Sequence, residues 1–125
     1  MVKVASIDLG SNSTRMLIAD ITNGNITTIY KEHQVTRMAD KLSESKIISK
    51  EATKRVLKVL ASYFKTINKN NVENIQIVGT AALRDATNSE EITQLIEKKI
   101  VSTWDVFLCN SLLSCFNINF LVLNV

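Results

Sequence analysis

The stretch Lys3-Val-Ala-Ser-Ile-Asp8-Leu-Gly-Ser-Asn-Ser-Thr-Arg15 decides the fold of this 125-residue chain. Its first six residues include Val4, Ala5 and Ile7 and predict a short buried strand that ends on a carboxylate, Asp8. Leu9–Asn12 follows as a turn, because Gly and Asn both tolerate positive φ angles. The residues from Thr14 to Ile21 are mostly apolar and predict a second strand, antiparallel to the first.

The next residues extend this hairpin. Thr22-Asn-Gly-Asn25 is a strong two-residue hairpin signal, and Ile26–Lys31 predicts a third strand. Residues 32–48 are mixed and polar and predict a connecting loop that can begin as strand. Ser49 is a candidate N-cap for an amphipathic helix that runs to about Asn70, with five lysines mostly on its exposed face.

The second half adds one strand and two helices. Residues 75–78 predict a fourth strand that ends at Gly79-Thr80, and Ala81–Ala86 predicts a short helix. Ser89 is expected to cap a helix that reaches Ile100, and residues 104–109 can form a fifth strand. The order β-β-β-α-β-α predicts the α/β class, with a mixed sheet of three antiparallel strands and a fourth added in parallel.

Composition excludes several classes of protein. Net charge is +3, 46% of residues are hydrophobic and 22% are charged, which argues against wholesale disorder. Two Cys are too few for a disulfide scaffold, and the single histidine, His33, cannot form a metal site alone. No signal peptide precedes Asp8, so we expect a cytoplasmic protein with no membrane partner. The lysine face of the helix over residues 50–69 has no interleaved aromatic residues, so we expect no nucleic acid as partner. The Lys-, Asn- and Ile-rich composition is compatible with a bacterial source.

The composition changes abruptly near Ile100. Residues 1–100 hold all 15 Lys and Arg and 11 of the 12 Asp and Glu, whereas residues 101–125 hold one charged residue, Asp105. We therefore expect 1–100 to be one lobe and 101–125 a foreign apolar tail, from a frameshift, an early stop or a gene-model error. The alternative is a native fifth strand followed by a short helix over residues 112–120.

Asp8–Arg15 is the first candidate site. A tight turn can direct several backbone N–H groups into one concavity, and such nests bind phosphate oxygens. Gly10, Ser11, Asn12 and Ser13 form this turn, and Asp8 is an oxygen ligand of the kind that Mg²⁺ prefers. Taken alone, the segment also fits an ordinary hairpin turn in which Gly10 and Asn12 supply backbone freedom.

Gly79–Ala86 is the second candidate site. A strand ends there in small residues that open a helix, helix N-termini attract anions, and Arg84 can pair with a phosphate. The alternative is an ordinary capped helix with a surface pair between Arg84 and Asp85.

Together the two segments resemble the N-terminal part of the Ppx/GppA phosphatase family, the exopolyphosphatases and guanosine pentaphosphate phosphohydrolases. The resemblance rests on Ala5-Ser-Ile-Asp8-Leu-Gly-Ser-Asn-Ser-Thr-Arg15 and on Thr80-Ala-Ala-Leu-Arg84-Asp-Ala-Thr-Asn88. Arg37 in the polar loop and the helix start at Ser49 fall in the order expected for the family. The resemblance covers about residues 2–100.

This resemblance implies a partial actin-like, ribonuclease-H-like ATPase lobe. It also implies hydrolysis of a terminal phosphoanhydride of polyphosphate or pppGpp with Mg²⁺, and a homo-oligomer in the intact family. By matched motif, Asp8 would lie beside the metal. The phosphate-binding residues would be Gly10, Ser11, Asn12, Ser13, Arg15 and Arg84.

The sequence departs from the family after Ile100. The family's Ser-Gly-x-Glu-Glu segment, with the glutamate thought to activate water, and its second phosphate loop are both absent, so no catalytic base is assigned. We therefore expect a phosphatase N-terminal domain that is incomplete and inactive alone. The alternatives are a non-enzymatic phosphate-binding or interaction fragment, or another actin-like ATPase such as a sugar or acetate kinase.

Overall fold

A computed structural model describes residues 1–100 and 106–109, and its strands form one mixed sheet. The order across the sheet is β3-β2-β1-β4-β5. Strands β1, β2 and β3 pair antiparallel, whereas β4 lies parallel to β1 and β5 parallel to β4. The strands are β1 (Val2–Leu9), β2 (Ser13–Thr22), β3 (Asn25–Val35), β4 (Asn74–Gly79) and β5 (Val106–Cys109).

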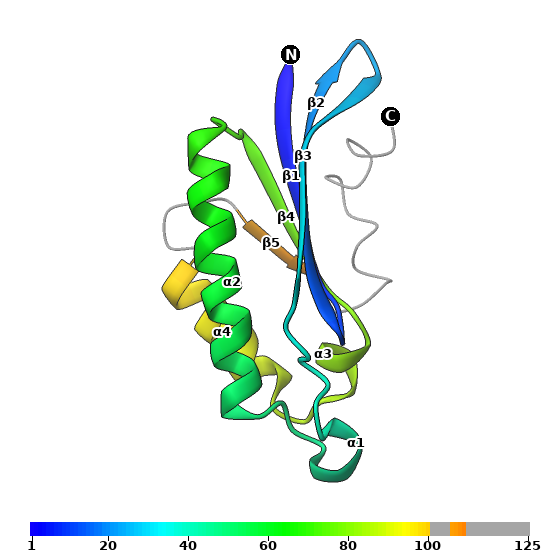
Figure 1. The fold of residues 1–125 in the computed structure, drawn as a ribbon, viewed down its shortest axis with the longest axis vertical. Coiled ribbons are helices and arrows are strands. Elements are labelled where there is room, and N and C mark those ends of the chain that lie inside the picture. The colour runs from blue at the N-terminus through cyan, green and yellow to red at the C-terminus, as the bar shows by residue number, and fades with distance from the viewer. Residues whose placement is uncertain (101–105, 110–125) are drawn as a thin grey trace.

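Two longer helices cover one face of this sheet, and two short helices lie at the end where β1 turns into β2 (Figure 1). The helix α2 begins as predicted, because the Ser49 hydroxyl accepts a hydrogen bond from the Ala52 N–H at 3.1 Å. It ends at the C-cap Asn70, and Asn71 follows at a φ of 54°. The helices are α1 (Leu42–Ser45), α2 (Lys50–Lys69), α3 (Ala81–Asp85) and α4 (Ser89–Ile100).

The hydrophobic core lies between the sheet and the helices α2 and α4. Alternation along the strands directs one set of side chains into this core and leaves the other set on the opposite face. Ile7 and Leu9 are therefore buried while Asp8 between them is exposed, and Thr14 and Met16 are buried while Arg15 is exposed. The fully buried side chains include Ile7, Leu9, Ile18, Leu60, Tyr63, Ile67, Ile77 and Ile96.

The predicted α/β class and element order are confirmed, with three differences. β3 extends to Val35, beyond the predicted end at Lys31, because Glu32, His33 and Gln34 are polar residues on an edge strand, where charge is tolerated. The short helix α1 was not predicted, since it is bounded by two non-glycine residues with left-handed backbone. Ser89 is the first residue of α4 and does not precede it as a cap.

The predicted boundary at residue 100 and the tail 101–125 fall mostly outside the described residues. Within that stretch the structure describes only β5, which lies inside the segment 104–109 where the sequence allowed a fifth strand. The helix considered for residues 112–120 lies outside the described part. In residues 1–100 and 106–109, no helix is both long enough and apolar enough to cross a membrane.

Candidate functional site

The turn between β1 and β2 is held by backbone hydrogen bonds on both sides. The Gly10 N–H donates to the Ser13 carbonyl at 3.0 Å. On the other side, the Asn12 carbonyl accepts from the N–H groups of Thr36 (3.0 Å) and Arg37 (2.9 Å), and the Ser11 carbonyl accepts from Ala39 (3.0 Å). The segment Thr36–Ala39 therefore packs along the turn and fixes the orientation of two of its peptide groups.

This orientation determines where the turn presents its donors. In a trans peptide the C=O and N–H bonds point in opposite directions. Because the carbonyls of Ser11 and Asn12 point toward residues 36–39, the N–H groups of Asn12 and Ser13 point away from that segment. Two successive N–H groups directed to one side are the basis of a phosphate-binding nest.

The two candidate segments, far apart in the sequence, meet at the end of β1. The Thr80 N–H and hydroxyl both donate to the Leu9 carbonyl, at 3.2 and 3.1 Å. Thr80 therefore does not cap α3 with its side chain but ties the second segment to the first. Beside this junction lies a cavity of about 450 Å³, lined by Ser11, Ala39, Leu42, Ser43, Lys46, Ala81, Ala82 and Asp85.

A clasp of hydrogen bonds joins the loop before α2 to the loop before α4, next to the cavity residue Lys46. The Asn88 side chain accepts from the Ile48 N–H at 2.9 Å and donates to the Ile48 carbonyl at 3.0 Å. The Thr87 N–H and hydroxyl both donate to the Lys46 carbonyl, at 2.9 and 3.0 Å. The end of the second motif thus fixes the backbone of Lys46, a cation that lines the cavity.

Asp8 and Arg15 lie on the open face of the sheet, away from α2. They are direct partners in the β1–β2 register, so their side chains are neighbours on that face. Both line a second cavity of about 430 Å³, together with Ser6, Leu17, Lys31 and His33 among others. Partial burial raises the pKa of the Asp8 carboxyl above its ordinary value, and the positive charge of Arg15 acts in the opposite direction.

Arg84 lies on the surface of α3 and pairs with its neighbour Asp85 at 3.4 Å. Both side chains are more than half exposed, so the pair contributes little to stability. α3 has only five residues, and the dipole of so short a helix offers an anion little. Arg84 is therefore accessible to a ligand, but the structure does not direct it into the cavity beside Ser11.

The structure thus places the predicted residues at the turn beside the junction, on the open face of the sheet and, for Arg84, on the surface of α3. Ser11 lines the cavity at the junction, Gly10, Asn12 and Ser13 belong to the same turn, and Asp8 and Arg15 lie on the open face.

Sequence reasoning missed Ser43, Lys46 and the anchoring segment Thr36–Ala39. The position of Arg37 in the polar loop was the one sequence feature that pointed to this segment, because backbone hydrogen bonds do not depend on the type of residue.

The donor set near the turn suits a metal only in part. In the residues that the structure describes, no group of three or more His, Cys, Asp or Glu side chains could hold a metal ion. Mg²⁺ is often bound by one or two carboxylates plus phosphate oxygens and water. Asp8 is a single accessible carboxylate next to the turn. It fits a site in which Mg²⁺ is bound by one carboxylate, phosphate oxygens and water, and it does not fit a site made of protein ligands alone.

Comparison with known proteins gives a consistent result. The sequence model of the Ppx/GppA phosphatase family matches residues 17–107. A guanosine-5'-triphosphate,3'-diphosphate pyrophosphatase from Aliivibrio fischeri is 43% identical over 84 residues, which are 67% of this chain and 17% of that protein.

Solved structures match over most of the chain. The crystal structure of the Aquifex aeolicus Ppx/GppA family member matches with a TM-score of 0.78 and 31% identity, covering 86% of this chain and 35% of that one. An exopolyphosphatase from Cytophaga hutchinsonii matches with a TM-score of 0.77 and 25% identity, covering 85% and 33%.

The chain therefore spans about a third of the solved relatives and less of the Aliivibrio protein. The matching sheet and helices identify the actin-like ATPase fold. Because the family model matches more than half of the residues of this chain, the chain belongs to the Ppx/GppA phosphatase family.

Proposed function

We propose that this chain is the phosphate-binding lobe of a phosphatase that removes the terminal phosphate from a phosphoanhydride chain, either inorganic polyphosphate or pppGpp. One observation carries the proposal: Thr80 joins the two motif segments at Leu9, beside a cavity that both segments line. The names of the relatives, an exopolyphosphatase and a pppGpp pyrophosphatase, support this substrate class.

Each residue has a distinct role in this proposal. The N–H groups of Asn12 and Ser13 and the Ser11 hydroxyl bind the oxygens of the terminal phosphate, while Gly10 allows the turn to close. Arg15 and Arg84, both exposed, supply positive charge to the rest of the phosphate chain. Lys46, on the rim of the cavity, adds a further cation.

Asp8 is the residue that would hold Mg²⁺ together with phosphate oxygens. When bound, Mg²⁺ neutralises charge on the phosphate chain. The Asp8 carboxyl must be ionised for this role; partial burial raises its pKa, and Arg15 opposite it in the register acts against that rise.

We further propose that this chain binds phosphate chains in the cytoplasm without hydrolysing them at an enzyme's rate. Hydrolysis needs a group that orients or deprotonates the attacking water. The carboxylate that lines the junction cavity is Asp85, which already pairs with Arg84, and residues 101–125 add only Asp105. The Ser-Gly-x-Glu-Glu segment expected to supply this group is absent from the sequence.

Calorimetric titration of the chain with long-chain polyphosphate, and separately with pppGpp, tests the binding proposal. Binding should strengthen with Mg²⁺, and Asp8→Asn should remove that increase. Ser11→Ala should weaken binding about ten-fold, because a hydrogen bond to a charged group is lost. Ser62→Ala, an exposed serine on α2, is the matched control and should leave the Kd unchanged.

The outcomes separate the candidate functions. Binding without phosphate release supports the proposal, and the tighter of the two ligands identifies the substrate. Phosphate release that requires Mg²⁺ and is lost in Asp8→Ala would show that the chain is active alone. Nucleotide-dependent phosphorylation of a sugar would point to a kinase, and absence of binding to both ligands would refute the phosphate-binding role.

A further inference from the structure

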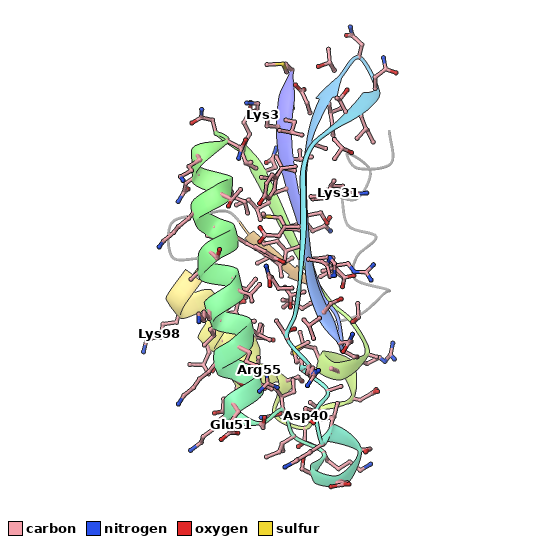
Figure 2. All side chains as sticks on the ribbon, in the orientation of Figure 1. Lys3, Lys31, Asp40, Glu51, Arg55 and Lys98 are labelled. Atoms are coloured by element: carbon pink, nitrogen blue, oxygen red, sulfur yellow. The ribbon has the colours of Figure 1, made fainter. Side chains whose placement is uncertain are left out.

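Arg55 of α2 contacts the segment that anchors the phosphate turn. Its Nε donates to the Thr36 carbonyl at 2.8 Å, and its Nη2 donates to the Arg37 carbonyl at 3.2 Å. Figure 2 shows Arg55 on the flank of α2 toward the loop that carries Asp40. The guanidinium group is planar and forked, so it can hold two successive carbonyls in one geometry.

The same two residues bind the turn with their other backbone groups. The N–H groups of Thr36 and Arg37 both donate to the Asn12 carbonyl, at 3.0 and 2.9 Å. Arg55 is therefore linked to the turn indirectly, through the backbone of Thr36 and Arg37. Two peptide units carry the contact, and no side chain of the turn is involved.

The held segment has an unfavourable local conformation. Arg37 has a φ of 49°, in the left-handed region that non-glycine residues rarely adopt. Such a conformation persists when the surroundings impose it, and the hydrogen bonds to its carbonyl and its N–H do so here. Without the fork of Arg55, residues 36–37 could relax to an extended conformation and release the Asn12 carbonyl.

A second contact from α2 holds the adjacent part of β2. The buried Tyr63 hydroxyl donates to the Thr14 carbonyl at 2.6 Å, and the hydroxyls of Thr14 and Thr36 are hydrogen-bonded at 3.0 Å. Residue Thr36 is thus fixed by its carbonyl, its N–H and its side chain together. α2 acts as a rigid support behind the turn.

Among the residues that the structure describes, Arg55 has no ion-pair partner. In the described residues the one ion pair is that of Arg84 with Asp85, and Arg55 shares a cavity of about 360 Å³ with Val35, Arg37 and Asp40. Within the described residues, the Arg55 side chain donates its hydrogen bonds to the carbonyl oxygens of Thr36 and Arg37. A role in geometry therefore accounts for its contacts better than a role in charge pairing.

We infer that Arg55 is a positioning residue for the phosphate turn. Its guanidinium group binds the carbonyls of Thr36 and Arg37, and this contact holds the Asn12 peptide so that the N–H groups of the turn face the ligand. This inference rests on the proposed phosphate-binding function. It assigns to α2 a part in ligand binding, although no residue of α2 lines the cavity beside Ser11.

Amide hydrogen exchange tests the positioning without any ligand. In Arg55→Met, the amides of Thr36, Arg37 and Ala39 should exchange about ten-fold faster, since their bonds to the turn open more often. Amides in the interior of β1 should keep their protection. Arg55→Lys, which offers one ammonium in place of a planar fork, should give an intermediate effect.

Titration with long-chain polyphosphate tests the consequence. Arg55→Met should weaken binding about ten-fold. Lys54→Met removes the same charge from an exposed neighbour on α2 and should change the Kd less than about two-fold. If Lys54→Met weakens binding as much as Arg55→Met, charge and not position explains the effect, and the inference is wrong.

The two proposals can fail separately. If the unmodified chain binds neither polyphosphate nor pppGpp, the proposed function fails, while the exchange experiment still decides whether Arg55 holds the turn. If Arg55→Met and Arg55→Lys leave exchange at Thr36, Arg37 and Ala39 unchanged, the positioning role is refuted even when polyphosphate binds.

Discussion

At the scale of single residues, the carbonyl oxygen of Ser13 lies 2.6 Å from the place where a Cβ atom on Gly10 would stand. That oxygen is backbone and accepts the Gly10 N–H, so it cannot move without opening the turn. Gly10→Ala should lower the free energy of unfolding by about 1–3 kcal/mol and abolish polyphosphate binding. Urea denaturation and calorimetric titration measure the two effects.

Gly24→Ala is the matched control for this substitution. Gly24 has a φ of +77° but no atom within 4 Å of the added Cβ, so the cost is strain alone. We expect a loss of about 1 kcal/mol with binding retained. Equal loss of binding in both variants would mean that general destabilisation, and not the geometry of the Gly10 turn, explains the result.

Tyr63 is the second residue with a measurable consequence, in its response to alkaline pH. Burial, with smaller contributions from Glu32 and Tyr30, raises the pKa of its hydroxyl from 10.0 to about 12. A raised pKa in the folded state means that stabilisation by the neutral phenol is complete below pH 10 and is lost as pH rises toward about 12.

Tyr63→Phe should therefore change both the size and the pH dependence of stability. Loss of the bond to the Thr14 carbonyl leaves that buried acceptor unpaired, at a cost of about 1–2 kcal/mol at neutral pH. The decline in stability above pH 10 should become shallower. Tyr30→Phe, whose exposed hydroxyl donates to Glu32, should cost less than about 0.5 kcal/mol, and urea melts across this pH range compare the two.

At the scale of elements, residue patterns predicted most of the fold. Apolar spacing located α2, and Asn23-Gly24, both at positive φ, located the β2–β3 hairpin. The errors arose where tertiary contacts override local preference. β3 continues through polar residues because β2 pairs with it as far as Val35, and α1 depends on left-handed Lys41 and Lys46.

The clasp of Asn88 on Ile48 joins the loop before α2 to the loop before α4 across 40 residues, next to the cavity residue Lys46. Asn88→Ala would leave the N–H and the carbonyl of Ile48 without these partners. We expect a loss of about 1–3 kcal/mol in the free energy of unfolding and weaker polyphosphate binding. Thr87→Val keeps the backbone bond to Lys46 and should cost less than half as much. Equal effects of the two substitutions in urea melts would contradict the clasp.

At the scale of the whole molecule, the sequence located both segments of the candidate site but not their relation. Thr80 was expected near a helix N-terminus, and in the structure its hydroxyl bonds to Leu9, 71 residues earlier. The hydrogen bonds of Arg55 and Tyr63 carried no sequence signal, because a bond to a distant carbonyl requires the tertiary fold. The motifs therefore indicated the chemistry of the site, whereas the side chains that support the turn could be identified only from the three-dimensional structure.

One hydrophobic cluster joins β1, β2, α2, β4 and α4, so we expect residues 1–100 to unfold as a single cooperative unit. Ile96 on α4 is fully buried in that cluster, whereas Leu95 beside it is only half-buried. Ile96→Ala should cost about 2–5 kcal/mol and shift one transition, with hydrogen exchange of β1 amides rising together with those of α4. Leu95→Ala should cost clearly less. If Ile96→Ala instead splits the urea transition in two, with α4 lost before β1, then α4 is an appendage and the lobe does not fold as one unit.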